Sequence, residues 1–454
     1  MTASDSPARQ RPTTSLAQTP QAPGALPVLG HGLLIARRPL DFISSLPAHG
    51  DLVRIKLGPR PAYVVTSPEL THRVLVTDAR AFERGWLFDK AARFLGSGLG
   101  TASGADHRRQ RRLVQPSFHR DRLPAYATVM RDQVQALAAR WQSGETVDMG
   151  QAMDRMSMSV ATHALFSPVL GARVGEVLRR VLPVLTDGVI RRTSLPDWWA
   201  ALPTPGNRRF ERAVTELRDA VDESIAAYRR SGVDHGDVMS MLLAGRDEDG
   251  SGLTDSEIYD QVVTLISAAV ETVGAALAWA FFEIAASEQV QRRLHAELDQ
   301  VPSGKPPQYT DLPRLDYTRR IVNEALRLSA AWLFMRRTIR TVRLGDVDLP
   351  PGTEVVYSPY LLHHDPRWYP DPDRFDPDRW APGTVIHPGA FVPYAAGPHQ
   401  CMGNAFAQIE MTTAIAVICG TWHLRVPAGA RARAVARIDV HPDRAPVIVE
   451  RRRT

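Results

Sequence analysis

Cysteine is scarce in this sequence of 454 residues, which contains only Cys401 and Cys419. Two cysteines in unlike surroundings supply neither the disulfide framework of a small secreted domain nor the four sulfur ligands of an iron–sulfur cluster. We therefore expect a protein of the reducing cytoplasm, in which any chemistry at a cysteine belongs to one cysteine alone.

Long apolar runs and runs of like charge are missing too. No stretch reaches the ~18 apolar residues of a membrane span, and residues 1–22 are polar and rich in Pro, Ser, Thr and Gln. We expect those residues to form a disordered tail and the chain to have no membrane span. The net charge is only +6, and the basic residues are spread without interleaved aromatics, which argues against a nucleic-acid partner.

Residues 23–454 have the pattern of one domain that is mainly α with small β-sheets. Residues 52–57 and 62–65 predict a hairpin around Gly58-Pro59. Residues 68–330 are helical in pattern, with breaks at 96–104, 196–205 and 245–252. Short strand signals follow residue 340, and the last of them spans residues 445–449.

The longest helix is expected to start at the cap Thr254-Asp255-Ser256-Glu257 and to end near Ser287. It is far longer than the mean of about 11 residues for helices in globular proteins. From Val262 to Ile284 it is apolar almost all round, so we expect it to cross the interior.

Cys401 stands in a glycine-containing loop, residues 391–403, directly before a helical pattern at 404–417. Gly397 and Gly403 allow the backbone to approach a flat ligand closely. Backbone amides at the start of the helix favour negative charge on the sulfur. The residues thus predict a cysteine that binds as a thiolate, whereas Cys419 has the setting of an inert, buried cysteine.

The segment from Tyr394 to Gly403 resembles the haem-binding signature of the cytochrome P450 family, Phe-x-x-Gly-x-Arg/His-x-Cys-x-Gly, with Tyr394 in place of Phe and His399 at the Arg/His position. The resemblance implies the fold of that family. It also implies haem b between the long central helix and the helix after the cysteine loop, with Cys401 as the ligand of the iron.

Other segments resemble the same family. Glu324-x-x-Arg327, with Arg379 in a proline-rich loop, is similar to the family's buried structural network. His107-x-x-x-Arg111 is similar to its helix pair that binds the haem propionates. The resemblance assigns the same role to His399 and to Arg336, which is expected just before a strand at residues 338–344. Arg337, beside Arg336, leaves open which of the two arginines does so.

The acid–alcohol pair Glu271-Thr272 lies within the long helix. A threonine in a helix can donate to the carbonyl four residues earlier and open a bend, and a carboxylate in an apolar helix is costly unless it is used or paired. In the resembling family this pair accepts dioxygen and relays protons to it. Ala269 replaces the more usual glycine, so the width of the oxygen groove is open.

The resemblance implies a monooxygenase that inserts one atom of dioxygen into an unactivated C–H bond. The sequence has no Gly-x-Gly-x-x-Gly loop. The electrons must therefore come from outside the chain, and the resemblance implies that they pass from NAD(P)H through a ferredoxin and its reductase. We expect Arg108, Arg109 and Arg112 to help dock the ferredoxin, and the enzyme to be a monomer. A peroxide-driven peroxygenase and a haem-based sensor are the alternatives, and the Glu271-Thr272 pair argues against both.

An apolar terpene, in particular a sesquiterpene of bacterial secondary metabolism, is the expected substrate. Weaker similarities to bacterial terpene-oxidising members favour it, as do the uncharged segments that surround the distal pocket in this family, here Trp86-Leu87-Phe88 in the loop before the His107 helix, Ala268-Ala269 and residues 331–334. A fatty acid anchored by Arg84, or a macrocycle, is the alternative.

Overall fold

The computed structural model describes residues 15–166, 172–194, 197–301 and 305–452. Its α-helices are α1 (Gly32–Arg37), α2 (Pro39–Ser45), α3 (Pro68–His72), α4 (Trp86–Leu95), α5 (Gly104–Val114), α6 (Leu123–Ala138), α7 (Met149–Leu165), α8 (Ala172–Ser194), α9 (Asp197–Ala200), α10 (Pro205–Ser231), α11 (Val238–Ala244), α12 (Asp255–Ala286), α13 (Glu288–Gln300), α14 (Asp316–Leu328), α15 (Pro359–His363) and α16 (Asn404–Thr421).

Its strands are β1 (Leu52–Leu57), β2 (Arg60–Val65), β3 (Phe82–Arg84), β4 (Glu145–Asp148), β5 (Phe334–Thr338), β6 (Val342–Leu344), β7 (Val347–Leu349), β8 (Glu354–Tyr357), β9 (Trp422–Arg425), β10 (Ala434–Ala436), β11 (Val440–Pro442) and β12 (Pro446–Arg451). The expected class, mainly α with small β-sheets, is confirmed.

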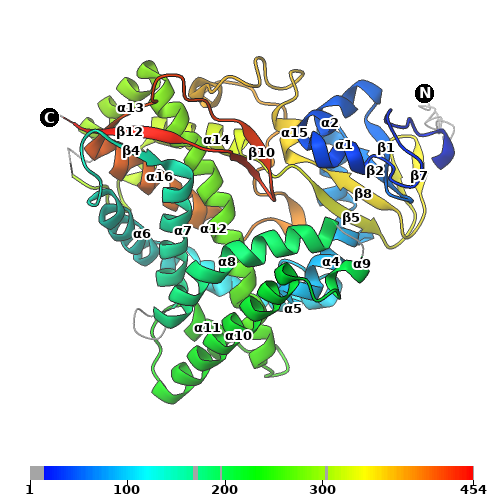
Figure 1. Ribbon diagram of the computed structural model, residues 1–454, viewed down its shortest axis with the longest axis horizontal. Coiled ribbons are helices and arrows are strands. Elements are labelled where there is room, and N and C mark those ends of the chain that lie inside the picture. Colours follow the sequence, from blue (N-terminus) through cyan, green and yellow to red (C-terminus); the bar gives the residue numbers. More distant parts are fainter. Residues whose placement is uncertain (1–14, 167–171, 195–196, 302–304, 453–454) are drawn as a thin grey trace, which may run out of the picture.

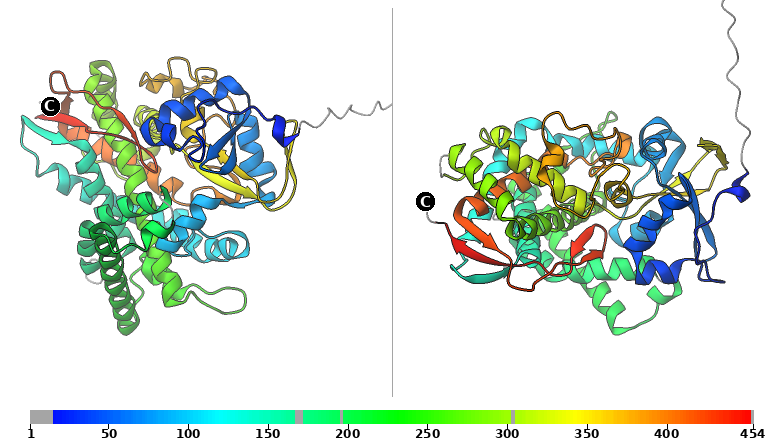
Figure 2. Two further views of the ribbon diagram at one scale, coloured as in Figure 1. Left: turned by 45° about the vertical axis from the view of Figure 1, so that its right-hand side comes forward. Right: turned by 90° about the horizontal axis from the view of Figure 1, so that it is seen from above.

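The molecule has a sheet side and a helix side (Figures 1 and 2). The largest sheet, in the order β1-β2-β8-β5-β3, lies near the N-terminus together with α1, α2 and α15, and most of the longer helices lie on the opposite side with the C-terminal strands. The predicted hairpin is β1–β2, with partners from Leu52↔Val65 to Leu57↔Arg60. Gly58 forms its turn at φ +63°, a conformation that glycine adopts without strain.

The predicted long helix is α12, which runs through the middle of the molecule (Figure 1). Its N-terminus has the predicted capping box, in which Glu257 N donates to Thr254 Oγ1 at 3.2 Å and Thr254 N donates to Glu257 Oε2 at 2.8 Å. Among the described residues, α12 is also the one helix that is long and apolar enough to cross a membrane, with a mean hydropathy of 1.7. It packs against α7, α14 and α16, which is the position of a core helix.

Three local expectations were wrong. Trp86-Leu87-Phe88 begins helix α4 instead of lying in a loop, and Arg336 lies within β5 instead of before a strand. Strands β3 and β4 interrupt the region expected to be helical. Both pair with strands far along the chain, β5 and β12, so tertiary pairing rather than local pattern decides their structure.

The packed part of the chain begins before the expected boundary at residue 23. Residues Leu16–Gln18 form a short 3-10 turn, and Ala22 is buried, with its backbone N–H donating to Arg54 O at 3.0 Å. Residues 1–14 lie outside the described ranges.

Candidate functional site

The loop around Cys401 is folded back on itself before α16. Cys401 N donates to Tyr394 O at 2.9 Å, and Gln400 N donates to Gly397 O at 3.0 Å. Gly397 has φ +68°, and a Cβ there would lie 2.0 Å from Leu75 O. Two features therefore require glycine at position 397: its left-handed backbone conformation, and the close approach of the segment around Leu75.

The Cys401 sulfur is solvent-accessible, unlike that of Cys419, which is fully buried as expected. The protein atoms packed around the sulfur nevertheless partly desolvate it, and this raises the pKa of the Cys401 thiol. The Gly403 N–H and the Arg111 guanidinium lower the pKa, but they offset only part of the rise. The chain by itself favours the thiol. A metal ion bound to the sulfur would reverse this, because a coordinating thiol is deprotonated outright.

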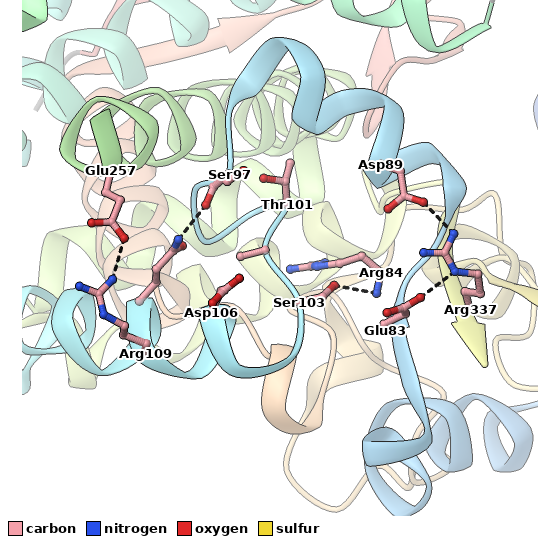
Figure 3. Close-up of a pocket in the computed structure, with 12 residues that line it drawn as sticks. Glu83, Arg84, Asp89, Ser97, Thr101, Ser103, Asp106, Arg109, Glu257 and Arg337 are labelled. Carbon is pink, nitrogen blue, oxygen red and sulfur yellow. Dashed lines mark hydrogen bonds and ion pairs between the residues drawn. The ribbon is translucent and has the colours of Figure 1, made fainter. Parts of the chain in front are cut away.

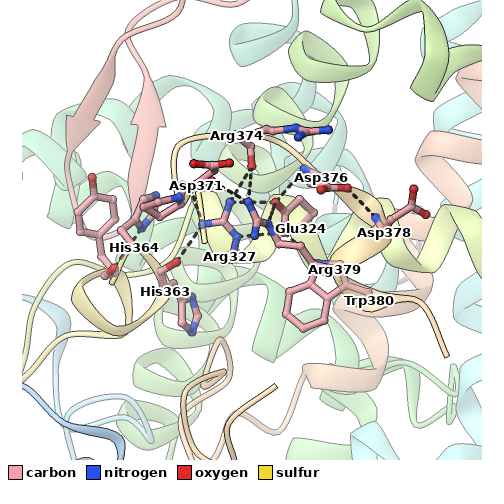
Figure 4. A network of polar contacts seen from close by, with 12 residues as sticks. Glu324, Arg327, His363, His364, Asp371, Arg374, Asp376, Asp378, Arg379 and Trp380 are labelled. Atoms are coloured by element: carbon pink, nitrogen blue, oxygen red, sulfur yellow. Dashed lines mark hydrogen bonds and ion pairs between the residues drawn. The ribbon is translucent and has the colours of Figure 1, made fainter. Parts of the chain in front are cut away.

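A buried ion-pair network lies beside this loop (Figure 4). Glu324 and Arg327 are both fully buried, and two bonds of 2.8 and 3.0 Å join them. The Glu324 carboxylate also accepts from Arg379 Nε at 3.3 Å, from Trp380 Nε1 at 2.9 Å and from Asp376 N at 3.0 Å. The sequence thus predicted all three charged members of the network.

The network reaches the cysteine loop through His363. Arg327 donates to His363 O at 2.9 Å, and His363 Nε2 accepts from Val392 N at 3.0 Å. Val392 begins the turn that leads to Tyr394 and Cys401, because Ala395 N donates to Val392 O. A continuous chain of hydrogen bonds therefore runs from Glu324 to the loop that presents the sulfur.

A cluster of cations faces the same region. Arg84 on β3 and Arg336 on β5 are direct cross-strand partners. Their guanidinium groups lie 4.6 and 6.0 Å from the Phe88 ring. On α5, the His107 ring lies 4.0 Å from the His399 ring of the cysteine loop. Arg111, one turn later, donates to Gln400 O at 2.8 Å.

Like charges opposite each other across two strands are destabilising unless an anion lies between them. The cluster has no carboxylate partner within the described residues, and Arg84 Nε and His399 Nδ1 are buried without a hydrogen bond. Burial and the neighbouring guanidinium groups lower the pKa of Arg84 to about 9, of His107 to about 4 and of His399 to about 2.

Arg337, the next residue on β5, is different. Its guanidinium bonds Glu83 and Asp89, each at 2.7 Å, so its charge is already balanced. The unbalanced cations therefore form a site for a group with two negative charges, and the two propionates of haem b have that chemistry. No signal in the sequence placed Arg84 in the cluster, because its position depends on the pairing of β3 with β5.

On α12, Thr272 Oγ1 donates to Ala268 O at 2.8 Å, as predicted. Ala268 and Thr272 keep exposed surface although the next turn of the helix is fully buried, so they face a space inside the protein. Ala269 instead packs against the main core. Burial raises the pKa of the neighbouring Glu271 to about 7, so this carboxyl group can both hold and release a proton at neutral pH.

A polar surface pocket of about 450 Å³ lies between β3, α5 and the start of α12 (Figure 3). Its wall includes Arg109.

The three arginines expected to dock a ferredoxin differ in their contacts. Arg109 bonds Glu257 at 2.6 Å and Asp247 at 3.4 Å. Arg112 bonds Asp247 at 2.9 Å. Of the three arginines expected to dock a ferredoxin, two are therefore engaged within the chain, and Arg108 is exposed.

Known proteins resemble the chain over most of its length. Its residues 20–433 match the family described as Cytochrome P450. It is 43% identical to Cyclooctat-9-en-7-ol 5-monooxygenase of Streptomyces melanosporofaciens, over 92% of this chain and 91% of that one. It is 42% identical to Pentalenene oxygenase of Streptomyces avermitilis, over 93% and 95% of the two chains. A crystal structure of the cytochrome P450DA heme domain shares the fold at a TM-score of 0.86 and 23% identity, over 98% of this chain and 99% of that one. The chain belongs to the cytochrome P450 family of haem-dependent monooxygenases.

Proposed function

We propose that this enzyme inserts one oxygen atom from dioxygen into a C–H bond of a terpene, with Cys401 as the haem ligand. One observation supports the haem site above all. The cationic side chains of Arg84 and Arg336 converge with the neutral imidazoles of His107 and His399, without an acid partner among the described residues, next to the loop that presents an accessible cysteine sulfur.

Each residue of the site has a separate task. Cys401 binds the iron, and a haem held by a thiolate supplies the splitting of the O–O bond of dioxygen. His107, Arg111, Arg336 and His399 bind the propionates, and we add Arg84 to this set. The Glu324–Arg327 network holds the loop and touches no reacting atom.

Glu271 and Thr272 deliver protons to the internal space that Ala268 and Thr272 face, where dioxygen would react. The bond from Thr272 Oγ1 to Ala268 O fixes the hydroxyl group against the helix backbone, next to the internal space. Glu271 is the adjacent group whose pKa, about 7, suits a donor that is refilled in each cycle.

The electrons come from NAD(P)H through a ferredoxin and its reductase, since the chain has no nucleotide loop of its own. Arg108 is the exposed cation on α5 that remains for an acidic partner. We place the enzyme in the cytoplasm as a monomer, with dioxygen and an apolar small molecule as its other partners.

The substrate is a terpene, in the first instance a sesquiterpene. Two similar proteins are named for oxidising cyclooctat-9-en-7-ol and pentalenene. In this chain, Phe88 stacks on Phe334 at 6.3 Å, within the two segments expected to wall the distal pocket. Arg84, which could have anchored a fatty acid, lies in the cation cluster instead. A pocket wall of aromatic and aliphatic side chains binds an apolar substrate by burying its surface, which contributes roughly 25 cal/mol per Å² of apolar area. Selection among apolar substrates then depends on their shape.

Turnover with NADPH, a surrogate ferredoxin, its reductase and a panel of terpenes, fatty acids and macrocycles tests this proposal. Oxidised terpene should be the main product. A panel in which only fatty acids are oxidised would contradict the substrate class, and product formed only with peroxide would contradict the route of the electrons.

We expect Arg336→Met to weaken haem binding by about 10- to 100-fold, the equivalent of one lost hydrogen bond between charged groups. Arg337→Met is the matched control. It changes the same residue type one position along β5, but it removes an arginine that Glu83 and Asp89 already neutralise. Haem titration of both apoproteins measures the difference, and equal losses would remove Arg336 from the haem site.

We expect Thr272→Ala to leave the haem spectrum unchanged and to divert electrons into peroxide, because proton delivery fails while electron entry continues. The yield of product per NADPH should fall by roughly tenfold or more. Thr272→Ser, which keeps the hydroxyl group, should retain most of the yield. If Thr272→Ala keeps the wild-type yield, the hydroxyl group has no part in the reaction.

A further inference from the structure

The Glu271 carboxyl group faces a histidine from the other end of the chain. Glu271 Oε1 lies 3.9 Å from His441 Nε2, and only 12% and 9% of the two side chains are exposed. Neither atom has a hydrogen-bond partner. The gap is too long for a direct bond, but a small side-chain rotation or one bridging water closes it.

The hairpin that carries His441 is fixed to the core at several points. His441 lies on β11, which pairs with β10. Its neighbour Val440 donates to Ser329 O at 3.2 Å and accepts from Trp279 Nε1 of α12 at 2.9 Å. Trp332 Nε1 donates to Arg437 O in the turn, at 2.6 Å. The position of the imidazole relative to α12 is therefore set by backbone anchors.

Further charged groups surround Glu271. Asp154 of α7 packs against the same face of α12, since a Cβ on Gly274, three residues after Glu271, would lie 2.3 Å from Asp154 Oδ1. Arg437 of the hairpin turn lowers the pKa of Glu271, whereas Asp154 and Asp187 of α8 raise it.

Asp439, also in the hairpin turn, is buried, and burial together with Glu271 raises its pKa to about 8. Burial and Arg437 lower the pKa of His441 to about 4, so its imidazole is neutral at neutral pH. Carboxyl groups crowded in this way share protons, so the cluster can store them at neutral pH.

We propose that the β10–β11 hairpin supplies protons to Glu271 through His441, which makes His441 a proton-relay residue behind the acid–threonine pair. This inference rests on the proposed function, because it requires Glu271 to pass protons on toward Thr272. The Nε2 proton of the neutral imidazole moves to the Glu271 carboxylate while Nδ1 takes a proton from a hydronium ion, which returns to solvent as water. The histidine stays neutral with its proton on Nδ1, and a flip of the imidazole ring brings an N–H back toward Glu271.

An infrared titration tests the contact without turnover. The C=O band of protonated Glu271, identified by its absence in Glu271→Gln, should move to higher frequency in His441→Leu, which removes the hydrogen-bond donor. In His441→Gln, which keeps a donor, the band should stay close to its wild-type position. An unchanged band in His441→Leu would show that the two side chains do not interact, and would overturn the proposal.

The yield of product per NADPH, measured in the holoenzyme from about one pH unit below to one above the Glu271 pKa, tests the transfer. In wild type the yield should stay level, since His441 refills Glu271. In His441→Gln it should fall by about tenfold as the pH rises through about 7, where Glu271 loses its proton. His295→Gln is the control, since burial also lowers the pKa of that histidine to about 4.

The outcomes separate the two proposals. If Glu271→Gln keeps the wild-type yield, the proposed proton path through the acid fails. If Glu271→Gln lowers the yield but His441→Gln does not, or lowers it equally at every pH, only the role of His441 fails. His441→Asn repeats the test if His441→Gln does not accumulate as folded protein.

Discussion

Cys401→His is expected to abolish the red-shifted Soret band of the reduced, carbon-monoxide-bound protein. Product formation should fall by more than about 10³-fold, or roughly 4 kcal/mol of barrier. A neutral imidazole cannot donate the electron density by which a thiolate favours splitting of the O–O bond. The loop itself should persist, because Cys401 N, which donates to Tyr394 O, is a backbone group that the substitution leaves in place.

Cys419→Ala serves as the control, since Cys419 is fully buried within the main hydrophobic core. Its spectrum should match that of wild type, with at most a modest loss of stability from the small cavity. A red-shifted band that survives in Cys401→His, or that disappears in Cys419→Ala, would contradict the assignment of the iron ligand.

Arg327→Ala should lower the free energy of unfolding by about 3 to 5 kcal/mol, because it leaves the Glu324 carboxylate buried without its main partner. It also removes the donors to His363 O and Pro372 O, at 2.9 and 2.7 Å. Since His363 holds Val392 at the start of the cysteine loop, the haem content should fall as well. Urea denaturation and the ratio of haem to protein measure the two effects.

Arg319→Ala is the matched control, on the same helix α14. Arg319 pairs with Asp316 three residues away, but 51% and 42% of these side chains are exposed. Exposed pairs contribute about 0 to 1 kcal/mol, so this variant should unfold almost as wild type does and keep its haem. Similar losses in both variants would show that the Glu324 network has no special role in holding the loop.

The sequence predicted the parts of the site that lie in local patterns. The cysteine loop, the capped central helix and the bond from Thr272 to Ala268 each depend on residues a few positions apart. The Glu324-Arg327-Arg379 set was predictable only from its resemblance to a known family, because an i,i+3 ion pair on a helix is far more often a surface feature.

The contributions of Arg84 and His441 could not be predicted in this way. Arg84 meets Arg336 only because β3 pairs with β5, and His441 meets Glu271 only because the C-terminal hairpin lies against α12. Both contacts join segments far apart in the chain, where periodicity carries no information. We propose Arg336 rather than Arg337 for the haem site because Glu83 and Asp89 already pair with Arg337, and these pairs are likewise visible only in the folded chain.

We propose that the enzyme activates dioxygen at a haem bound to Cys401 and places one of its atoms in an apolar substrate. Turnover under heavy-isotope dioxygen, with NADPH, a surrogate ferredoxin and its reductase, tests this most directly by mass spectrometry of the product. We expect one heavy oxygen atom per hydroxylation in wild type, and no labelled product from Cys401→His. Product whose new oxygen comes from water or from added peroxide, or the absence of any product across the substrate panel, would contradict it.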